Sequence, residues 1–230
     1  MIATLIPLAL ATINFDAEIN DPILENALAG VCIMDEGGET LYENLGDTRL
    51  VPASNQKILS TIYVLERLGP DFVPELKIWK TSPTSYYVDA PGTPGLTRED
   101  LQEAHKAIGS PSFAAIKVRQ AFNPLIPPTW EYDDLPHRYA ARVSSLSFDR
   151  GGFELWGEDG KALDLPPEYK IIVRRVYTGS TRKIDYDPFK RVIRVSGPVP
   201  EKRSFLEAFA IPDPDATAAR ILGGTLVNTT

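Results

Sequence analysis

The residues with the clearest chemical potential are Ser54 and Lys57, which stand three positions apart in the segment Ser54-Asn55-Gln56-Lys57. On a helix, positions i and i+3 share one face, so the lysine amine reaches the serine hydroxyl. A serine hydroxyl is a weak nucleophile near neutral pH and needs an adjacent base. A lysine serves as that base only when burial and nearby positive potential lower its pKa. The spacing fits acyl transfer, with Ser54 as the nucleophile and Lys57 as the general base.

Because this pair stands at the start of a predicted helix, a backbone N–H group can also take part in the chemistry. A helix N-terminus supplies positive potential and free N–H groups, so the backbone N–H of Ser54 is a candidate oxyanion donor. One such donor is worth roughly 3 kcal/mol in other enzymes. Taken alone, Ser-x-x-Lys is a weak motif, and the simpler interpretation is a Ser N-cap followed by a surface lysine.

The surrounding sequence favours the chemical interpretation. Pro52 precedes the motif, and apolar residues recur at helical spacing at Ile58, Ile62, Leu65 and Leu68. Gly69-Pro70 then ends the helix, since Gly suits the C-cap and Pro forbids continuation. The sequence predicts a buried helix over 54–68, which is the setting that Ser-x-x-Lys requires in penicillin-recognising enzymes.

The elements before and after this helix follow from periodicity and turn residues. The apolar spacing predicts a helix over 16–28, with Pro22 in its first turn. A buried strand over 30–34 returns over 40–42 as a hairpin, and Cys32 inside it reads as a small buried hydrophobe. A capping-box-like start at Thr97 predicts a helix that Gly109 closes.

From residue 142 onward the pattern is that of β-structure. Turn residues separate the predicted strands, which span 143–148, 153–156, 170–177, 183–186, 191–196 and 205–210, and a helix follows over 215–222. The first two flank Asp149-Arg150-Gly151-Gly152, a hairpin signal. Seven basic residues crowd these strands: Arg174, Arg175, Arg182, Lys183, Lys190, Arg191 and Arg194. They indicate either the solvated face of a sheet or a contact surface for an acidic cell-wall polymer.

Composition excludes several classes of protein. The 230 residues are 43% hydrophobic and 24% charged, which is ordinary globular composition rather than that of a disordered chain. No apolar run reaches 18 residues, which excludes a multi-pass membrane protein. With 24 basic and 31 acidic residues the net charge is −7, which disfavours nucleic-acid binding. One cysteine and two distant histidines leave no internal disulfide and no zinc-ligand spacing.

The N-terminal segment 1–14 has two interpretations. Residues 2–11 form an apolar stretch of signal-peptide length, and Ala9-Leu10-Ala11 has the form of a cleavage site. No Lys or Arg precedes the stretch, and Pro7 interrupts it. The segment is therefore either an export signal or a first strand or buried arm.

Several blocks together resemble one family, the serine-type D-alanyl-D-alanine carboxypeptidase/endopeptidases, which are low-molecular-mass class C penicillin-binding proteins. Its nucleophile helix is similar to VPASNQKIL (51–59) followed by LGPDF (68–72), and its first core strand to AGVCIMD (29–35). Its inserted β-rich domain is similar to PPTWEYDDLP (127–136) and YAARVSSLSFD (139–149). The segments GPVP (197–200) and AIPDP (210–214) match the return to the main domain. The likeness runs discontinuously from about residue 18 to residue 226 and covers the N-terminal part of the family.

The resemblance implies an α/β fold, in which a partial penicillin-binding-protein/β-lactamase-like transpeptidase core is interrupted by a β-rich inserted domain. The expected divisions are a first part of the core with the nucleophile helix over 15–80, the insert over 81–200, and a truncated return to the core over 201–230. In this arrangement we expect residues 29–34 and 205–210 to lie in one sheet.

The resemblance also implies a function. Ser54 would attack the penultimate D-alanine of a peptidoglycan stem peptide ending in D-Ala-D-Ala, and β-lactams would inhibit it. It implies no cofactor, metal, nucleic acid or integral membrane span in the mature chain, and a periplasmic or extracellular location at the wall. The family's Ser-x-Asn and Lys-Thr-Gly motifs are absent, so we expect weak activity. The alternatives are an inactive relative that binds the wall or a protein through the β-rich domain, and an unrelated soluble β-rich binding protein.

Overall fold

A computed structural model describes residues 14–90, 92–93, 95–122, 126–176 and 179–227. It divides into two compact units, Met1–Phe72 and Val73–Thr230. The predicted signal segment, apart from Asn14, lies outside the described residues. Among the helices of the described ranges, none is long and apolar enough to cross a membrane.

The first unit begins with a helix that is shorter than predicted. Helix α2 spans only Phe15–Ile19, and a separate 3-10 turn, η1, spans Pro22–Leu24. Proline has no N–H to donate to the preceding turn, and it drives the residue before it out of the helical region. Asp21 accordingly has ψ 135°. The predicted single helix over 16–28 is therefore wrong, because Pro22 separates two short elements.

A two-stranded antiparallel hairpin follows, as predicted. Strand β1 (Val31–Met34) pairs with β2 (Thr40–Asn44). The predicted burial is wrong, since the Cys32 side chain is exposed. The physical reason is that β1 and β2 form a sheet of two strands alone among the described residues, so neither face of β1 is fully covered.

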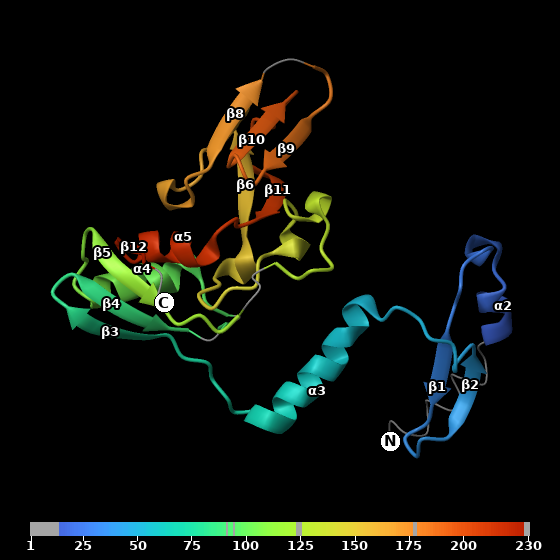
Figure 1. Cartoon of the computed structure of the whole chain (residues 1–230). Helices are drawn as coiled ribbons and strands as arrows, with labels where there is room; N and C mark the ends of the chain where they lie inside the picture. The colour runs from blue at the N-terminus through green and yellow to red at the C-terminus, as the bar shows by residue number, and fades with distance from the viewer. Residues whose placement is uncertain (1–13, 91, 94, 123–125, 177–178, 228–230) are drawn as a thin grey trace. The chain divides into compact units, whose positions relative to one another are not determined.

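In the second unit, a four-stranded sheet carries two helices (Figure 1). Its order is β12-β5-β4-β3, with bounds β3 Lys77–Ser82, β4 Ser85–Asp89, β5 Ala114–Val118 and β12 Gly224–Leu226. The helices are α4 (Arg98–Ala107) and α5 (Pro214–Ile221), which contact each other. Alternate residues of β4 and β5, such as Val88 and Ile116, are fully buried and belong to the same core as Leu101 and Leu222.

A second sheet corrects two expectations. Its order is β11-β6-β7, with bounds β6 Gly152–Glu158, β7 Lys161–Ala162 and β11 Ser204–Ala210. The predicted strand 143–148 is irregular, because its backbone is bound elsewhere: Leu146 N–H donates to the Asp215 carboxylate at 2.8 Å, and the next residue after the segment, Asp149, donates its N–H to the Leu96 carbonyl at 2.9 Å. Strand β6 pairs instead with β11. The expectation that 29–34 and 205–210 share a sheet is also wrong, because β1 pairs with β2.

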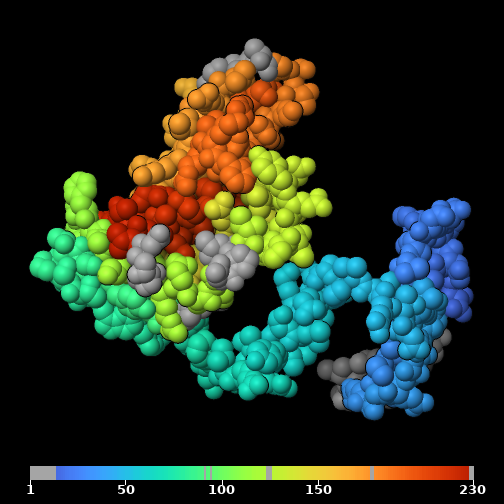
Figure 2. Space-filling view, in the orientation of Figure 1, coloured from blue at the N-terminus to red at the C-terminus, as the bar shows by residue number. Residues whose placement is uncertain are grey.

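The third sheet confirms three predicted strands. It has the order β8-β10-β9, with bounds β8 Ile172–Val176, β9 Lys183–Asp187 and β10 Val192–Ser196. Figure 2 shows the yellow-green chain that precedes β6 lying against these orange strands, and the Tyr132 ring stacks on Phe189 with centroids 5.5 Å apart. The remaining short elements are 3-10 turns: η3 Tyr132–Asp134, η4 Arg138–Ala140, η5 Asp149–Gly151 and η6 Pro167–Tyr169.

Four of the seven basic residues on and beside these strands have carboxylate partners. The ion pairs are Arg175–Asp164, Lys190–Asp187, Arg191–Asp213 and Arg194–Asp185. A guanidinium already paired with a carboxylate presents less free positive charge to an acidic polymer. The pairing therefore favours the interpretation of this cluster as a solvated, internally balanced sheet face.

Candidate active site

Ser54 lies in a 3-10 turn, η2 (Ala53–Asn55), that leads directly into helix α3 (Gln56–Leu68). The predicted helix over 54–68 thus begins with a tighter turn. Ala53, immediately before the serine, has φ +43°, and a left-handed conformation costs a non-glycine residue roughly 1–2 kcal/mol.

The C-terminal end of α3 confirms its predicted cap. Gly69 has φ +80°, and its N–H donates to the Leu65 carbonyl at 2.9 Å. Glycine takes this conformation without the steric cost that other residues meet. The length and end of the helix that carries the Ser-x-x-Lys motif are therefore fixed by local sequence.

The structure brings the two predicted side chains together. The Lys57 Nζ donates a hydrogen bond to the Ser54 Oγ at 3.0 Å, which is the approach expected from the i, i+3 spacing. In this arrangement the lysine Nζ is the donor, whereas a general base must accept the proton of the serine hydroxyl. The contact establishes reach and alignment, and the roles of the two residues stay a prediction.

The predicted burial of this helix is wrong. No residue of α3 is buried, and Ile58, Leu59, Ile62, Leu65 and Leu68 are 49–61% exposed. Ser54 and Lys57 are exposed as well. The apolar residues still recur at helical spacing, but nothing described in the first unit covers them. Within the first unit, taken by itself, Ser54 and Lys57 are therefore an open pair of side chains.

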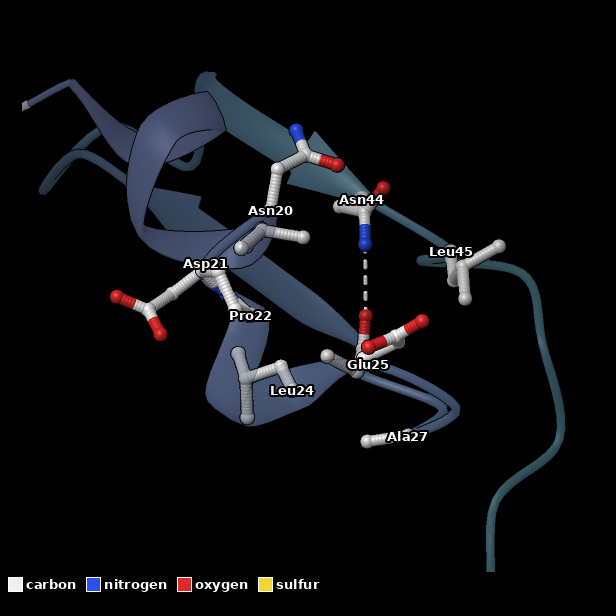
Figure 3. Close-up of a pocket in the computed structure, with 10 residues that line it drawn as sticks. Asn20, Asp21, Pro22, Leu24, Glu25, Ala27, Asn44 and Leu45 are labelled. Atoms are coloured by element: carbon white, nitrogen blue, oxygen red, sulfur yellow. Dashed lines mark hydrogen bonds between the residues drawn. The ribbon is translucent and has the colours of Figure 1, made fainter.

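A pocket in the same unit lies at the hairpin and involves neither predicted residue. It has a volume of about 500 Å³, and Asn20, Pro22 and Leu45 are among the residues that line it. Figure 3 shows the Asn44 side chain at its wall, where the amide Nδ2 donates to the Ala29 carbonyl at 2.7 Å. Asp21 and Glu25 are its ionisable side chains, so its lining offers neither a hydroxyl or thiol nucleophile nor a cationic base.

A charged cluster in the second unit was not singled out by sequence reasoning. The Asp213 carboxylate pairs with Arg191 at 2.9 Å and Arg220 at 3.3 Å and accepts the Thr217 hydroxyl at 3.0 Å. Burial opposes ionisation of Asp213, but the Arg191 hydrogen bond and the two guanidinium charges together hold its pKa below the usual value. The sequence feature that could have pointed to this cluster is the turn Pro212-Asp213-Pro214, in which an acidic residue comes just before a proline that starts a helix.

Within the part of the chain that the structure describes, no three His, Cys, Asp or Glu side chains are grouped so that they could hold a metal ion. The chemistry available at the described site is therefore that of the serine hydroxyl, the lysine amine and the N–H groups of the first turn. These groups suit acyl transfer to a serine.

A family model fits this combination of motif and fold. The model described as the D-Ala-D-Ala carboxypeptidase 3 (S13) family matches residues 11–229. The chain belongs to this family. The resemblance expected from the nucleophile helix and the β-rich blocks is thereby confirmed.

Individual relatives agree with the family. The chain is 28% identical over 243 residues to the D-alanyl-D-alanine carboxypeptidase of Actinomadura sp. (strain R39), an alignment that covers 90% of this chain and 44% of that protein. Penicillin binding protein 4 of Haemophilus influenzae matches with a TM-score of 0.70 and 20% identity, over 94% of this chain and 56% of that structure. Its complex with a β-lactam matches with a TM-score of 0.59 and 20% identity, over 89% and 51%. The α/β fold class is confirmed, and the chain spans about half the length of these relatives.

Proposed function

We propose that this chain carries the nucleophile of a serine-type D-Ala-D-Ala carboxypeptidase and that the acyl-enzyme forms on Ser54. The single observation that carries the proposal is the 3.0 Å hydrogen bond between Lys57 Nζ and Ser54 Oγ at the start of α3. Membership of the family supports it, because Ser-x-x-Lys is the motif on which penicillin-recognising enzymes place their nucleophile.

The proposed reaction has two steps. In the first, the neutral Lys57 amine takes the Ser54 hydroxyl proton as Oγ bonds to the carbonyl carbon of the penultimate D-alanine. The peptide C–N bond then breaks, the terminal D-alanine leaves after its nitrogen gains a proton, and an ester remains on Ser54. In the second step, water attacks the ester and restores the serine. The β-lactam amide would acylate the same oxygen.

The backbone N–H of Ser54 is the proposed oxyanion donor. It lies in the first turn of the helical segment, where N–H groups have no carbonyl one turn earlier to bind. A donor in that place faces the charge that develops on the carbonyl oxygen as the tetrahedral intermediate forms.

The proposed substrate is a peptidoglycan stem peptide that ends in D-Ala-D-Ala, and the proposed inhibitors are β-lactams. The related penicillin binding protein 4 has been crystallised with a β-lactam, which supports the inhibitor class for this chain. A wall peptidase acts outside the cytoplasmic membrane, so we place the protein in the periplasm or the extracellular space, associated with the wall. The division into core (15–80), β-rich insert (81–200) and return to the core (201–230) stays part of this proposal.

We further propose that the 230-residue chain alone turns over slowly. Ser-x-Asn and Lys-Thr-Gly do not occur in it, and in the family reading these groups protonate the leaving amine, bind the terminal carboxylate and complete the oxyanion hole. Loss of one oxyanion donor typically costs about 100- to 1000-fold in rate. The purified chain should release little D-alanine from diacetyl-Lys-D-Ala-D-Ala.

The second candidate is an inactive relative that binds the wall through the second unit. The exposure of Ser54 and Lys57 within the first unit favours it, because no described residue of that unit encloses a substrate beside them. The two candidates differ in whether Ser54 reacts covalently with a β-lactam.

Labelling with a fluorescent penicillin distinguishes the serine peptidase from the inactive relative. We expect slow, saturable labelling of the full chain, its loss in Ser54→Ala, and its retention in Ser60→Ala. Ser60 is the matched control, because it lies on α3 and binds only the Gln56 carbonyl of its own helix, at 3.1 Å. Labelling that survives Ser54→Ala would contradict the assignment of the nucleophile, and no labelling of the wild-type chain would favour the inactive relative.

A further inference from the structure

A second cavity, in the unit Val73–Thr230, belongs to no part of the proposed peptidase chemistry. Its volume is about 710 Å³, within the range of roughly 300–1,000 Å³ that small-ligand sites occupy. It lies where the start of α4, the turn η5, strand β6 and Arg203 meet. Neither Ser54 nor Lys57 is among its lining residues.

One wall of the cavity is aromatic. The half-buried Trp156 ring lies there, together with Phe153 and Tyr169, which are buried in the core. The indole is held in place on several sides: its Nε1 donates to Glu154 at 3.1 Å, and Phe205 meets it edge-on with centroids 6.0 Å apart. The Arg203 guanidinium lies 5.5 Å from its centroid. The guanidinium lies over one face of the ring, and the half-buried indole still lines the cavity with apolar surface.

The polar groups of the cavity carry both signs of charge. Four arginines (Arg98, Arg138, Arg150 and Arg203) and three acids (Glu99, Asp149 and Glu154) line it. Most arginines are already neutralised: Arg98 by Glu168 at 3.1 Å, Arg138 by Glu154 at 3.8 Å, and Arg203 by Glu158 at 3.6 Å. A strongly anionic ligand would face the three carboxylates, and a cationic one the four guanidiniums. The balance favours a neutral ligand that both donates and accepts hydrogen bonds.

The backbone presents two of these groups at a conformational cost. Asp149, Arg150 and Gly151 have φ +48°, +58° and +71° in succession, and only the glycine adopts such values freely. Two hydrogen bonds hold the turn. The Asp149 N–H donates to the Leu96 carbonyl at 2.9 Å, and the Arg98 N–H donates to the Asp149 carboxylate at 3.2 Å. Such residues persist where the surrounding structure holds them, so the turn presents Asp149 and Arg150 to the cavity in a fixed conformation.

We propose that this cavity binds the N-acetylated amino-sugar backbone of the wall polymer. A pyranose ring has an apolar face that stacks on an indole, and its adjacent hydroxyls match the two-pronged geometry of guanidinium and carboxylate groups. An acetamido group adds one acceptor for an arginine and one donor for a carboxylate, which is the mixture that lines the cavity. The identity of the polymer rests on the proposed wall-peptidase function, while the class of ligand rests on the cavity.

Calorimetric titration of the full chain with the tetramer of N-acetylglucosamine tests the proposal. We expect saturable binding that is at least tenfold weaker in Trp156→Ala and in Arg150→Gly. The second variant keeps the left-handed turn, because glycine adopts φ +58° without strain, so its loss of affinity is not a loss of fold. Trp79→Ala is the matched control, since Trp79 is half-exposed on β3 and lines no part of this cavity; it should change affinity less than twofold.

Two further arms define the ligand. A glucose tetramer, which lacks the acetamido groups, should bind at least tenfold more weakly, and diacetyl-Lys-D-Ala-D-Ala should not compete. The proposal is overturned by an absence of saturable heat up to several millimolar, by equal effects of the Trp156 and Trp79 variants, by equal binding of the glucose tetramer, or by competition from the peptide. Penicillin labelling of the same samples reports on Ser54 separately, so a failure of the peptidase proposal is distinguishable from a failure of this one.

Discussion

The Asp213 carboxylate illustrates how one residue joins several elements. It accepts bonds from Arg191, the residue just before β10, and from Arg220 and Thr217 on α5. Its side chain is 22% exposed, so its charge is only partly solvated. An unpaired charge here would be costly, because neither guanidinium has a second carboxylate among its ion pairs.

Replacing this residue should therefore lower stability. Asp213→Ala should cost about 1.5–3 kcal/mol, the value of a hydrogen bond to a charged group, in urea unfolding at pH 7. The matched control is Asp185→Ala, which removes the exposed pair with Arg194 and should cost about 0.2–1 kcal/mol. Equal losses in the two variants would mean that the cluster contributes no more than a surface pair.

The same carboxylate predicts a pH dependence. Its pKa is lowered in the folded state from an ordinary value of 3.8, so it contributes stability above that value and loses it as the pH falls through the lowered pKa. Unfolding between pH 5 and pH 2 should show a stability loss below about pH 4 that is shallower in Asp213→Asn. If the loss of stability at low pH were the same in Asp213→Asn as in the wild type, it would have to come from other carboxylates.

Sequence reasoning at this scale succeeded where spacing alone decides a contact. The three-residue offset of Ser54 and Lys57 predicted their hydrogen bond, because helical geometry is local. The burial of Cys32 could not be predicted in the same way, since burial depends on which strand or helix happens to cover a face. An apolar side chain shows only that its burial would be favourable, and it does not show which element buries it.

At the scale of elements, the four residues 97–100 specify where helix α4 begins. The Asp100 N–H donates to the Thr97 hydroxyl at 3.1 Å, and the Thr97 N–H donates to the Asp100 carboxylate at 2.8 Å. This reciprocal cap supplies acceptors to two N–H groups at the helix start that have no carbonyl partner within the helix. It was predicted from sequence because each partner lies within one turn of the other.

Removing the cap should weaken the helix measurably. Thr97→Ala should lower the free energy of unfolding by about 1 kcal/mol, measured by urea denaturation. Thr225→Ala, on the short edge strand β12, is the control and should change stability by less than about 0.5 kcal/mol. A Thr97 variant as stable as wild type would show that the Asp100 carboxylate caps the helix unaided.

Helices α3 and α5 should differ strongly in local stability. An isolated 13-residue helix is marginal in water, and α3 has no buried residue, whereas six of the residues of α5 are buried. In hydrogen exchange at neutral pH, α3 amides should exchange at least about 100-fold faster than those of Ala218 and Leu222. Equal protection in the two helices would contradict the exposure of α3.

The irregular segment 143–148 marks the limit of prediction at this scale. Its alternation of apolar and polar residues is that of a strand, and Leu146 and Phe148 are indeed buried. Its partner was not the adjacent segment but the Asp215 side chain, 69 residues further along. Strands β3, β4 and β5 were also not predicted: β4 pairs with β5 across helix α4, but β3 and β4 form a local hairpin, and the alternation around Tyr86 and Val88 was available as a signal.

For the whole molecule, the division after Phe72 predicts a proteolytic pattern. Trypsin should cut first at Lys57 and Arg67, because backbone in a helix without buried residues opens readily to a protease. A C-terminal fragment that retains residues 73–230 should persist longest, as observed by mass spectrometry of a time course. Early cleavage at Arg175 or Arg191, which are held by ion pairs in the second unit, would contradict this order.

The aromatic cluster of the second unit also sets an optical property of the chain. The rings of Tyr169 and Tyr186 pack on Phe153 with centroids 5.4 and 5.7 Å away, and burial raises the pKa of both hydroxyls well above the ordinary value of 10. Such groups stabilise the fold below about pH 10, and their contribution is lost as the pH rises toward the raised pKa. In an alkaline titration followed by ultraviolet absorbance, the exposed tyrosines should therefore ionise gradually, and these two should appear as tyrosinates together in one abrupt step when the second unit unfolds.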